Sequence, residues 1–216
     1  MTRSPTRRPP QRKTYHHGDL RHALLESGVQ LAREGGPDAV VLREATRRVG
    51  VVPNAAYRHF ANHEELLQAV RSAAWSAMAV TIEEELATLP RSGQAIELAG
   101  AGLRAIGAGY LRFARSETGL FRTIFSSAFD RPPGSPDPAK TGRSGLTPFQ
   151  LLGAALDRLV EVGVLPAQRR PGAEFLAWSA VHGMALLVID GPMRDLPQGL
   201  VQTMEKRLLE MVEKGL

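Results

Sequence analysis

The pattern of apolar and polar positions is helical along almost the whole chain. Apolar residues recur at spacings of three and four, which places them on one face of an α-helix. The last segment carries such residues at spacings of 3, 4 and 3, at Val201, Met204, Leu208 and Met211. The predicted helices cover residues 20–34, 42–49, 53–60, 63–86, 94–115, 118–128, 145–163, 171–190 and 195–214.

No stretch shows the two-residue alternation of a half-buried strand, so the sequence predicts an all-α protein. Asp19 is expected to cap the first helix, and Gly35-Gly36-Pro37 ends it. Residues 130–143 contain four prolines and two glycines, and they are expected to form a long, mobile loop.

Composition narrows the class of protein. The chain has 216 residues, of which 43% are hydrophobic and 23% charged, as in globular proteins. The absence of cysteine excludes disulfides, thiolate catalysis and Cys-ligated zinc, and it fits a reducing compartment. Neither a signal peptide nor a run of 18 apolar residues is visible, so we expect a cytoplasmic protein that does not enter the membrane.

Positive charge is concentrated in the first third of the chain. Residues 1–63 carry 11 Lys/Arg against 5 Asp/Glu, whereas residues 64–216 carry 16 against 17. Residues 1–18 are predicted to be a disordered basic arm, since the first 13 hold five basic residues, three prolines and no acidic residue. This asymmetry favours nucleic acid as a partner, although a solvated tail would have the same composition.

The two short helices at 42–49 and 53–60 are joined by three residues that begin with Gly50. This is the length of a helix-turn-helix, in which the second helix enters the major groove, although a helical hairpin on a bundle surface has the same spacing. Pro53 suits the first turn of that helix. Asn54 and Ala55 are then expected to project towards base edges, with Phe60 facing the core. The expected phosphate contacts come from Tyr57, Arg58 and His59.

Two segments carry a resemblance to a known family. YHHGDLRHALLESGVQLAREGG and LREATRRVGVVPNAAYRHFANHEELL resemble the N-terminal domain of TetR-type transcriptional regulators, over residues 15–70. Trp178-x-x-x-His182-Gly183 is similar to the WHG type of TetR C-terminal domain. The resemblance implies a three-helix DNA-binding domain at 19–63, followed by a six-helix ligand-binding and dimerisation domain at 64–216.

The resemblance also implies partners and site residues. The partners are a palindromic double-stranded DNA operator, a second copy of the chain and a small-molecule effector, with no cofactor, metal or catalytic activity. Arg43 and the residues Pro53, Asn54 and Ala55 would face bases, while Tyr57 and His59 would hold phosphates with Arg58 nearby. The last two helices would pair with their counterparts in a four-helix dimer interface.

The sequence departs from the family pattern at three informative positions. Val41 and Val52 stand where the family usually has Ser or Thr, so neither can cap its helix. His63 replaces the usual Lys, is mostly neutral at pH 7, and is expected to make DNA binding pH-sensitive; a flat affinity from about pH 6 to 8 would contradict this. We hypothesise that the basic arm compensates through the DNA backbone or minor groove, with Arg7, Arg8, Arg12 and Lys13.

Other motifs admit simpler interpretations. Residues 100–105 match a GxGxxA dinucleotide pattern without the strand that it requires, so small residues at 99–102 and 105–109 are expected to let helices approach closely. His59 and His63 have the i,i+4 spacing of metal ligands, but no third ligand is near in sequence.

Trp178 and His182 lie one turn apart and are either a hydrogen-bonded core pair or the wall of an effector pocket. The other residues expected at that pocket are Phe113, Phe121, Phe125 and Met184. The predicted function is a ligand-responsive transcriptional regulator, most often a repressor in this family, with activation left open. The alternative is a helical small-molecule-binding protein or enzyme with a vestigial helix-turn-helix.

Overall fold

The computed structural model describes residues 17–127 and 137–216, with side chains from Leu20 onward. These residues contain nine α-helices, three short 3-10 helices and no strand, so the all-α prediction is confirmed for them. The α-helices are α1 (His17–Gly35), α2 (Leu42–Val49), α3 (Pro53–Ala56), α4 (His63–Ala87), α5 (Ala95–Ser116), α6 (Thr118–Ile124), α7 (Pro148–Glu161), α8 (Ala173–Ile189) and α9 (Gln198–Gly215). None of them is both long and apolar enough to span a membrane.

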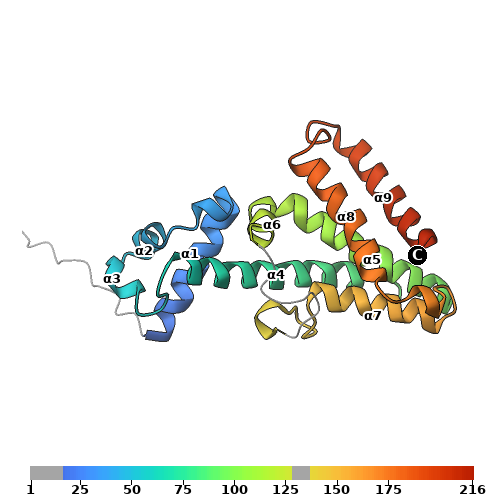
Figure 1. The fold of residues 1–216 in the computed structure, drawn as a ribbon, viewed down its shortest axis with the longest axis horizontal. Coiled ribbons are helices and arrows are strands. Elements are labelled where there is room, and N and C mark those ends of the chain that lie inside the picture. Colours follow the sequence, from blue (N-terminus) through green and yellow to red (C-terminus); the bar gives the residue numbers. More distant parts are fainter. Residues whose placement is uncertain (1–16, 128–136) are drawn as a thin grey trace, which may run out of the picture.

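The long helix α4 extends from the end that holds α1 to α3 into the other half of the molecule (Figure 1). Helices α1 to α3 gather at one end, α5, α6 and α7 pack against the other half of α4, and α8 and α9 lie against α5. Leu66 and Val70, in the first half of α4, are fully buried and lie beside Gly28 of α1. Met78 and Ile82, in the second half, are also buried, and Ile82 lies beside Gly109 of α5. One helix therefore supplies both cores, and the domain boundary expected at residues 63 and 64 stays a prediction.

Helix ends follow local capping chemistry. Asn62 caps α4, because its Oδ1 accepts from the Glu65 N–H at 2.9 Å. Gly50 ends α2 in the left-handed region at φ 77°, where only glycine is unstrained. Val41 and Val52 make no side-chain cap, as expected from their chemistry.

Three predicted helix ends were wrong. Helix α1 begins at His17, so Asp19 lies inside the helix and is not its N-cap. Residues 1–16 of the predicted arm lie outside the described residues, and the arm stays a prediction. Helix α6 stops at Ile124. Helix α3 is a single turn, because the N–H groups of His59 and Phe60 both bond the Ala56 carbonyl and close the chain into a turn.

The small residues of α5 allow close helix packing, as predicted, and the GxGxxA pattern lies within that helix. A Cβ on Gly109 would lie 2.7 Å from the Cα of Ile82, so the backbones of α4 and α5 are almost in contact. A Cβ on Gly107 would lie 2.3 Å from Leu209 of α9. Glycines at these positions set the distance from α5 to two neighbouring helices.

Gly109→Ala is expected to lower the free energy of unfolding by about 1–3 kcal/mol, the usual cost of overpacking. The clash is with backbone, so it outweighs the ~1 kcal/mol that alanine gains over glycine in a helix. Gly102→Ala is the matched control, because nothing lies within 4 Å of a Cβ there. Urea denaturation should show Gly102→Ala unchanged or stabilised; equal stability of the two variants would contradict the packing argument.

Candidate functional site

The first turn of α3 presents a small outward surface. Pro53 and Asn54 are exposed, and Val52, which precedes them, has 68% of its surface exposed. Ala55 is only partly exposed and packs against the core, so it projects less than the sequence suggested. The outward surface at the start of α3 is therefore made by residues 52–54.

The predicted phosphate-binding residues follow in the turn after α3. Tyr57 is 55% exposed, Arg58 is exposed and His59 is partly buried. Phe60 is fully buried, as expected, and the Arg21 guanidinium lies 5.0 Å from the centre of its ring. Phe60 thus anchors the turn, and the residues just before it stay at the surface. His63, at the start of α4, is also exposed.

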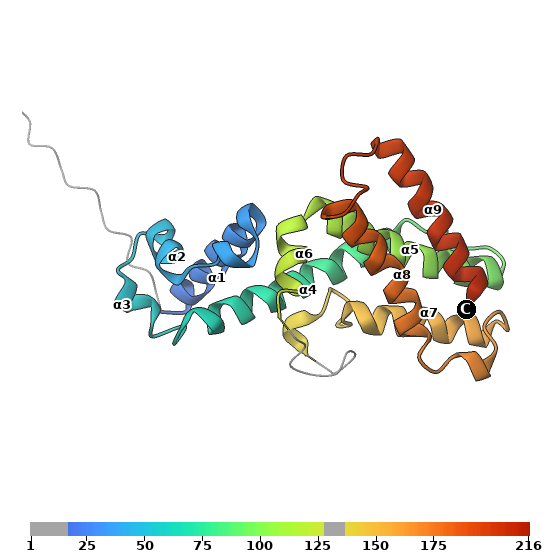
Figure 2. The ribbon, with the colours of Figure 1, turned by 45° about the horizontal axis from the view of Figure 1, so that its top comes forward.

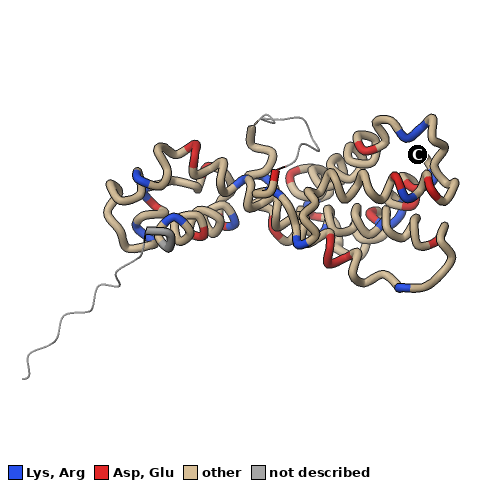
Figure 3. The backbone as a smooth tube through the Cα atoms, turned by 90° about the horizontal axis from the view of Figure 1, so that it is seen from below, with Lys and Arg blue, Asp and Glu red and all other residues tan. Residues whose placement is uncertain are grey.

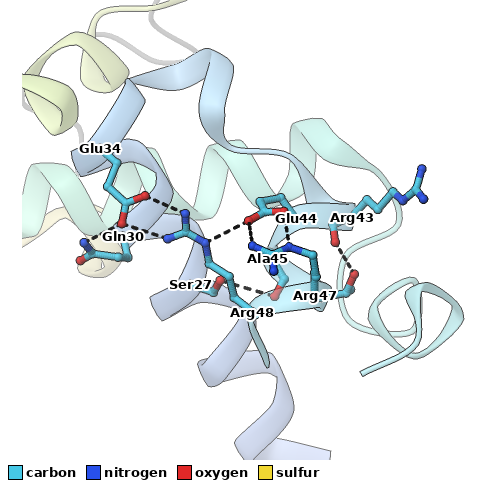
Figure 4. A network of polar contacts seen from close by, with 9 residues as sticks. Ser27, Gln30, Glu34, Arg43, Glu44, Ala45, Arg47 and Arg48 are labelled. Atoms are coloured by element: carbon cyan, nitrogen blue, oxygen red, sulfur yellow. Dashed lines mark hydrogen bonds and ion pairs between the residues drawn. The ribbon is translucent and has the colours of Figure 1, made fainter. Parts of the chain in front are cut away.

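Ion pairs occupy two of the three arginines of α2 (Figure 4). Arg48 donates to both carboxylate oxygens of Glu34, at 3.0 and 2.6 Å, and to Glu44 at 3.3 Å. Arg47 donates to Glu44 at 2.8 and 2.7 Å. Arg48 lowers the pKa of Glu34 to about 2, and Arg47 lowers that of Glu44 to about 2. Arg43 is exposed and points away from this network, so it is the α2 arginine that these glutamates leave available.

The folded part of the N-terminal region is close to neutral. Residues 19–63 hold six Lys/Arg and five Asp/Glu, whereas residues 1–18 hold five Lys/Arg and no acidic residue. Acidic and basic positions are interspersed along the α1–α3 end of the molecule (Figure 3). The predicted arm residues Arg7, Arg8, Arg12 and Lys13 lie outside the described residues. Nearly all of the excess positive charge of this region therefore belongs to the arm.

Three side chains of the C-terminal half form a hydrogen-bonded chain. The Trp178 indole N–H donates to the Tyr110 hydroxyl at 3.2 Å, and that hydroxyl lies 2.8 Å from His182 Nδ1. Since the hydroxyl oxygen accepts from the indole, its proton is available to Nδ1, which fits a neutral His182 protonated at Nε2. Burial lowers the pKa of His182 and raises that of Tyr110, so both groups stay neutral near pH 7.

Aromatic rings from α4, α5, α6, α7 and α8, and from the residue that ends α6, surround these three hydrogen-bonded side chains. The Phe125 and Phe121 rings lie 4.5 and 5.7 Å from the His182 ring. The aromatic cluster consists of Trp75, Tyr110, Phe121, Phe125, Phe149, Trp178 and His182. Four predicted pocket residues thus meet. Phe113 and Met184 are buried as well, but among the described residues no ring contact joins Phe113 to the cluster. Trp178 and His182 are joined through the Tyr110 hydroxyl and both are partly buried, so the core pair and the pocket wall both stay predictions.

A separate cleft of about 290 Å³ lies between α5 and α9. Leu111 lies on its α5 side, and Gln202 and Glu205 on its α9 side. Glu205 is buried, which raises the pKa of its carboxyl, and the nearest Arg115 nitrogen is 3.4 Å away. None of the predicted effector residues lines this cleft.

Helix α6 meets α1 backbone to backbone. A Cβ on Gly119 would lie 2.1 Å from the Ala32 carbonyl oxygen and 2.6 Å from that of Arg33. The Arg33 Nε donates to Glu117 at 2.9 Å beside this contact. We call these four residues the α1–α6 junction. The junction joins α1, at the helix-turn-helix end, directly to α6, which contributes Phe121 to the aromatic cluster.

Helices α8 and α9 lie side by side on one flank (Figure 2). They carry a group of large apolar side chains that the single chain leaves exposed: Phe175, Leu176, Leu186, Leu187, Leu200, Met204 and Met211. Val201 is buried, so the predicted α9 stripe is divided between an inner and an outer face. Gly183 of α8 has nothing within 4 Å of a built Cβ, which leaves room for a close helix crossing.

Comparison with known proteins identifies the family. The profile described as "Bacterial regulatory proteins, tetR family" matches residues 24–70. The profile described as "Tetracyclin repressor-like, C-terminal domain" matches residues 103–212. No curated protein is significantly similar to the chain.

Several solved structures share the fold. A protein of unknown function from Rhodococcus sp. RHA1 is 21% identical with a TM-score of 0.73, over 95% of this chain and 99% of that one. A TetR-family transcriptional regulator from Pectobacterium atrosepticum is 16% identical with a TM-score of 0.62, over 95% and 96%. FadR from Bacillus subtilis, in complex with stearoyl-CoA, is 14% identical with a TM-score of 0.55, over 90% and 98%. At these identities, the likeness to solved structures concerns the fold alone.

Proposed function

Because the chain belongs to the TetR family of bacterial regulatory proteins, we propose that it is a cytoplasmic repressor, released from a palindromic operator by a small molecule. Regulators of this family are generally DNA-binding proteins without catalytic activity. The observation that carries the proposal is the exposed surface at the start of α3, which lies between the left-handed Gly50 turn and the buried Phe60. A recognition helix has this arrangement, because the exposed residues at its N-terminal end, here Pro53 and Asn54, are the ones that meet base edges in this motif.

The DNA contacts divide into two groups. Asn54 and Arg43 are proposed to meet base edges, since amide and guanidinium groups can pair with purines in the major groove. Tyr57, Arg58, His59 and His63 are proposed to lie along phosphates. Pro53 and Ala55 are proposed to make van der Waals contacts with the bases, and Ala55 is the less exposed of the two. Two such surfaces, one from each subunit, would occupy half-sites about 34–36 Å apart.

The aromatic cluster is proposed to be where the effector acts. Apolar and aromatic side chains with few polar groups are typical of small-molecule sites, and here the polar groups are those of Tyr110, Trp178 and His182. FadR holds stearoyl-CoA within the same fold. We therefore propose an effector with an apolar body and one hydrogen-bonding group, which would compete for the Tyr110–His182 hydrogen bond and would be bordered by Phe113 and Met184.

The test of this function uses the full-length chain and DNA upstream of its own gene. We expect sequence-specific binding whose affinity falls as the salt concentration rises. The effector should lower the affinity for operator by a certain factor, and the operator should lower the affinity for effector by the same factor. A protein that binds no genomic fragment but still binds an apolar ligand would instead be a helical carrier or enzyme. If transcription of the regulated gene fell when the regulator was deleted, the protein would be an activator and not a repressor.

Gly119→Ala is expected to weaken the link between effector and operator. The added methyl group overlaps the α1 carbonyls, so α6 and α1 must separate. We expect operator affinity, or its response to effector, to change by about 2- to 30-fold, which corresponds to ~0.5–2 kcal/mol. Gly102→Ala serves as the control because its Cβ meets nothing. Unchanged affinity and unchanged response in Gly119→Ala would rule out coupling through this junction.

A further inference from the structure

Val52 is an exposed apolar side chain at the place where DNA is expected. It has 68% of its surface exposed and stands directly before Pro53, the first residue of α3. Its carbonyl accepts from the Ala55 N–H at 3.0 Å, but its side chain makes no cap. A hydroxyl residue would stabilise the helix here. The free chain thus gains neither burial nor a hydrogen bond from this valine.

The side chain of Val52 is also held rigidly. A residue before proline is restricted to extended backbone, and Val52 has φ −73° and ψ 145°. Branching at Cβ restricts its χ1 rotamers as well. A rigid group loses little conformational entropy when it binds, so its methyl groups are presented to a partner in advance.

The partner can be identified from the chemistry of the major groove. Most base-edge groups there are hydrogen-bond donors or acceptors, and the C5-methyl of thymine is the apolar group that projects farthest into the groove. Recognition helices contact base edges through their N-terminal residues, and Val52 lies at that end of α3, next to the exposed Asn54. We propose that Val52 contacts the methyl group of one thymine in each operator half-site, and so determines part of the operator sequence. This inference rests on the proposed DNA-binding function.

The test compares thymine with deoxyuridine, which lacks only the methyl group. The full-length protein first selects its operator from random double-stranded DNA. Each thymine of a half-site is then replaced in turn by deoxyuridine, and Kd is measured. We expect one position at which the replacement raises Kd about fourfold, the value of one buried methyl-sized group, and about sixteenfold when both half-sites are changed.

Variants assign the effect to Val52. In Val52→Ala, deoxyuridine at that position should no longer change Kd. Val52→Ser should lose the same sensitivity even though it can cap α3, so a destabilised helix would not explain the result. Val41→Ala is the matched control, because Val41 is also an exposed valine before a helix without a side-chain cap; its deoxyuridine profile should equal that of the wild type.

Two results would overturn the inference while leaving DNA binding intact. One is a selected operator in which no thymine is sensitive to deoxyuridine. The other is a sensitivity that persists unchanged in both Val52→Ala and Val52→Ser. Failure to enrich any DNA would be a different outcome, because it would overturn the proposed function together with this inference.

Discussion

Deletion of residues 1–13 should weaken operator binding about a hundred- to a thousandfold near 0.1 M salt. Each phosphate contact contributes a slope of about 0.9 in log K against log salt, so loss of Arg7, Arg8, Arg12 and Lys13 should reduce the slope by roughly 3 to 4. The effect is large because the folded residues 19–63 hold six basic residues against five acidic ones. Arg47 and Arg48 are, moreover, already paired with glutamates.

A full-length variant isolates charge from chain length in this experiment. Substitution of Arg3 and the same four arm residues by Gln keeps the length and removes all five basic side chains that the deletion removes. It should reproduce the loss of affinity and of slope seen with the deletion. Binding measured by fluorescence anisotropy between about 50 and 300 mM salt would give both the operator affinity and its salt slope. If deletion left affinity and slope unchanged, the arm would have no role on DNA, and Arg43 and Arg58 would have to supply the electrostatic attraction.

We propose that the exposed apolar side chains of α8 and α9 form the interface with a second copy of the chain. Leu187→Glu should then dissociate this dimer and, as a consequence, weaken operator binding. Leu187 is exposed on α8 and belongs to the group of exposed apolar residues that α8 and α9 carry. In a two-fold dimer each substitution occurs twice, and a buried charge left without a partner costs about 3–5 kcal/mol. Dimer dissociation should therefore rise a hundredfold or more, and loss of the second half-site should reduce operator affinity by about 10²–10⁴.

Sedimentation measurements and DNA titrations would check the two parts of this result. Leu187→Met is the matched control, since it keeps an apolar side chain of similar volume and should dimerise normally. The helical circular dichroism of Leu187→Glu should match the wild type, because the residue is exposed in the single chain. A Leu187→Glu protein that remained dimeric would show that α8 pairs through another face or not at all.

The sequence was sufficient to predict the helices with long apolar patterns. Helices α4, α5, α8 and α9 begin and end within a few residues of the expected positions, since their periodicity extends over many turns. Helix α3 was overestimated, because a four-residue turn is governed by the carbonyl of Ala56 and the burial of Phe60 rather than by periodicity. Short helices depend on tertiary contacts, which local pattern does not contain.

Contacts within the aromatic cluster could be predicted where the residues are close in sequence. Trp178 and His182 are one turn apart, so the i,i+4 spacing indicated them. Tyr110, which bonds both, lies on a different helix and carries no local signal of that contact. The ion pair between Arg48 and Glu34 was missed for the same reason, although it determines which arginine of α2 is left for DNA.

The α1–α6 junction also bears on how this protein can change in evolution. At Gly119 the contact is made by main-chain atoms of both helices, so it depends on one missing side chain and on no particular partner residue. Residues around the aromatic cluster can then be exchanged to suit a new effector while the α1–α6 junction, which leads to the DNA-binding end, stays unchanged. The cost of this freedom is a single position at which any added side chain would overlap the α1 carbonyls, so descendants of this regulator should vary in effector and operator while retaining that glycine.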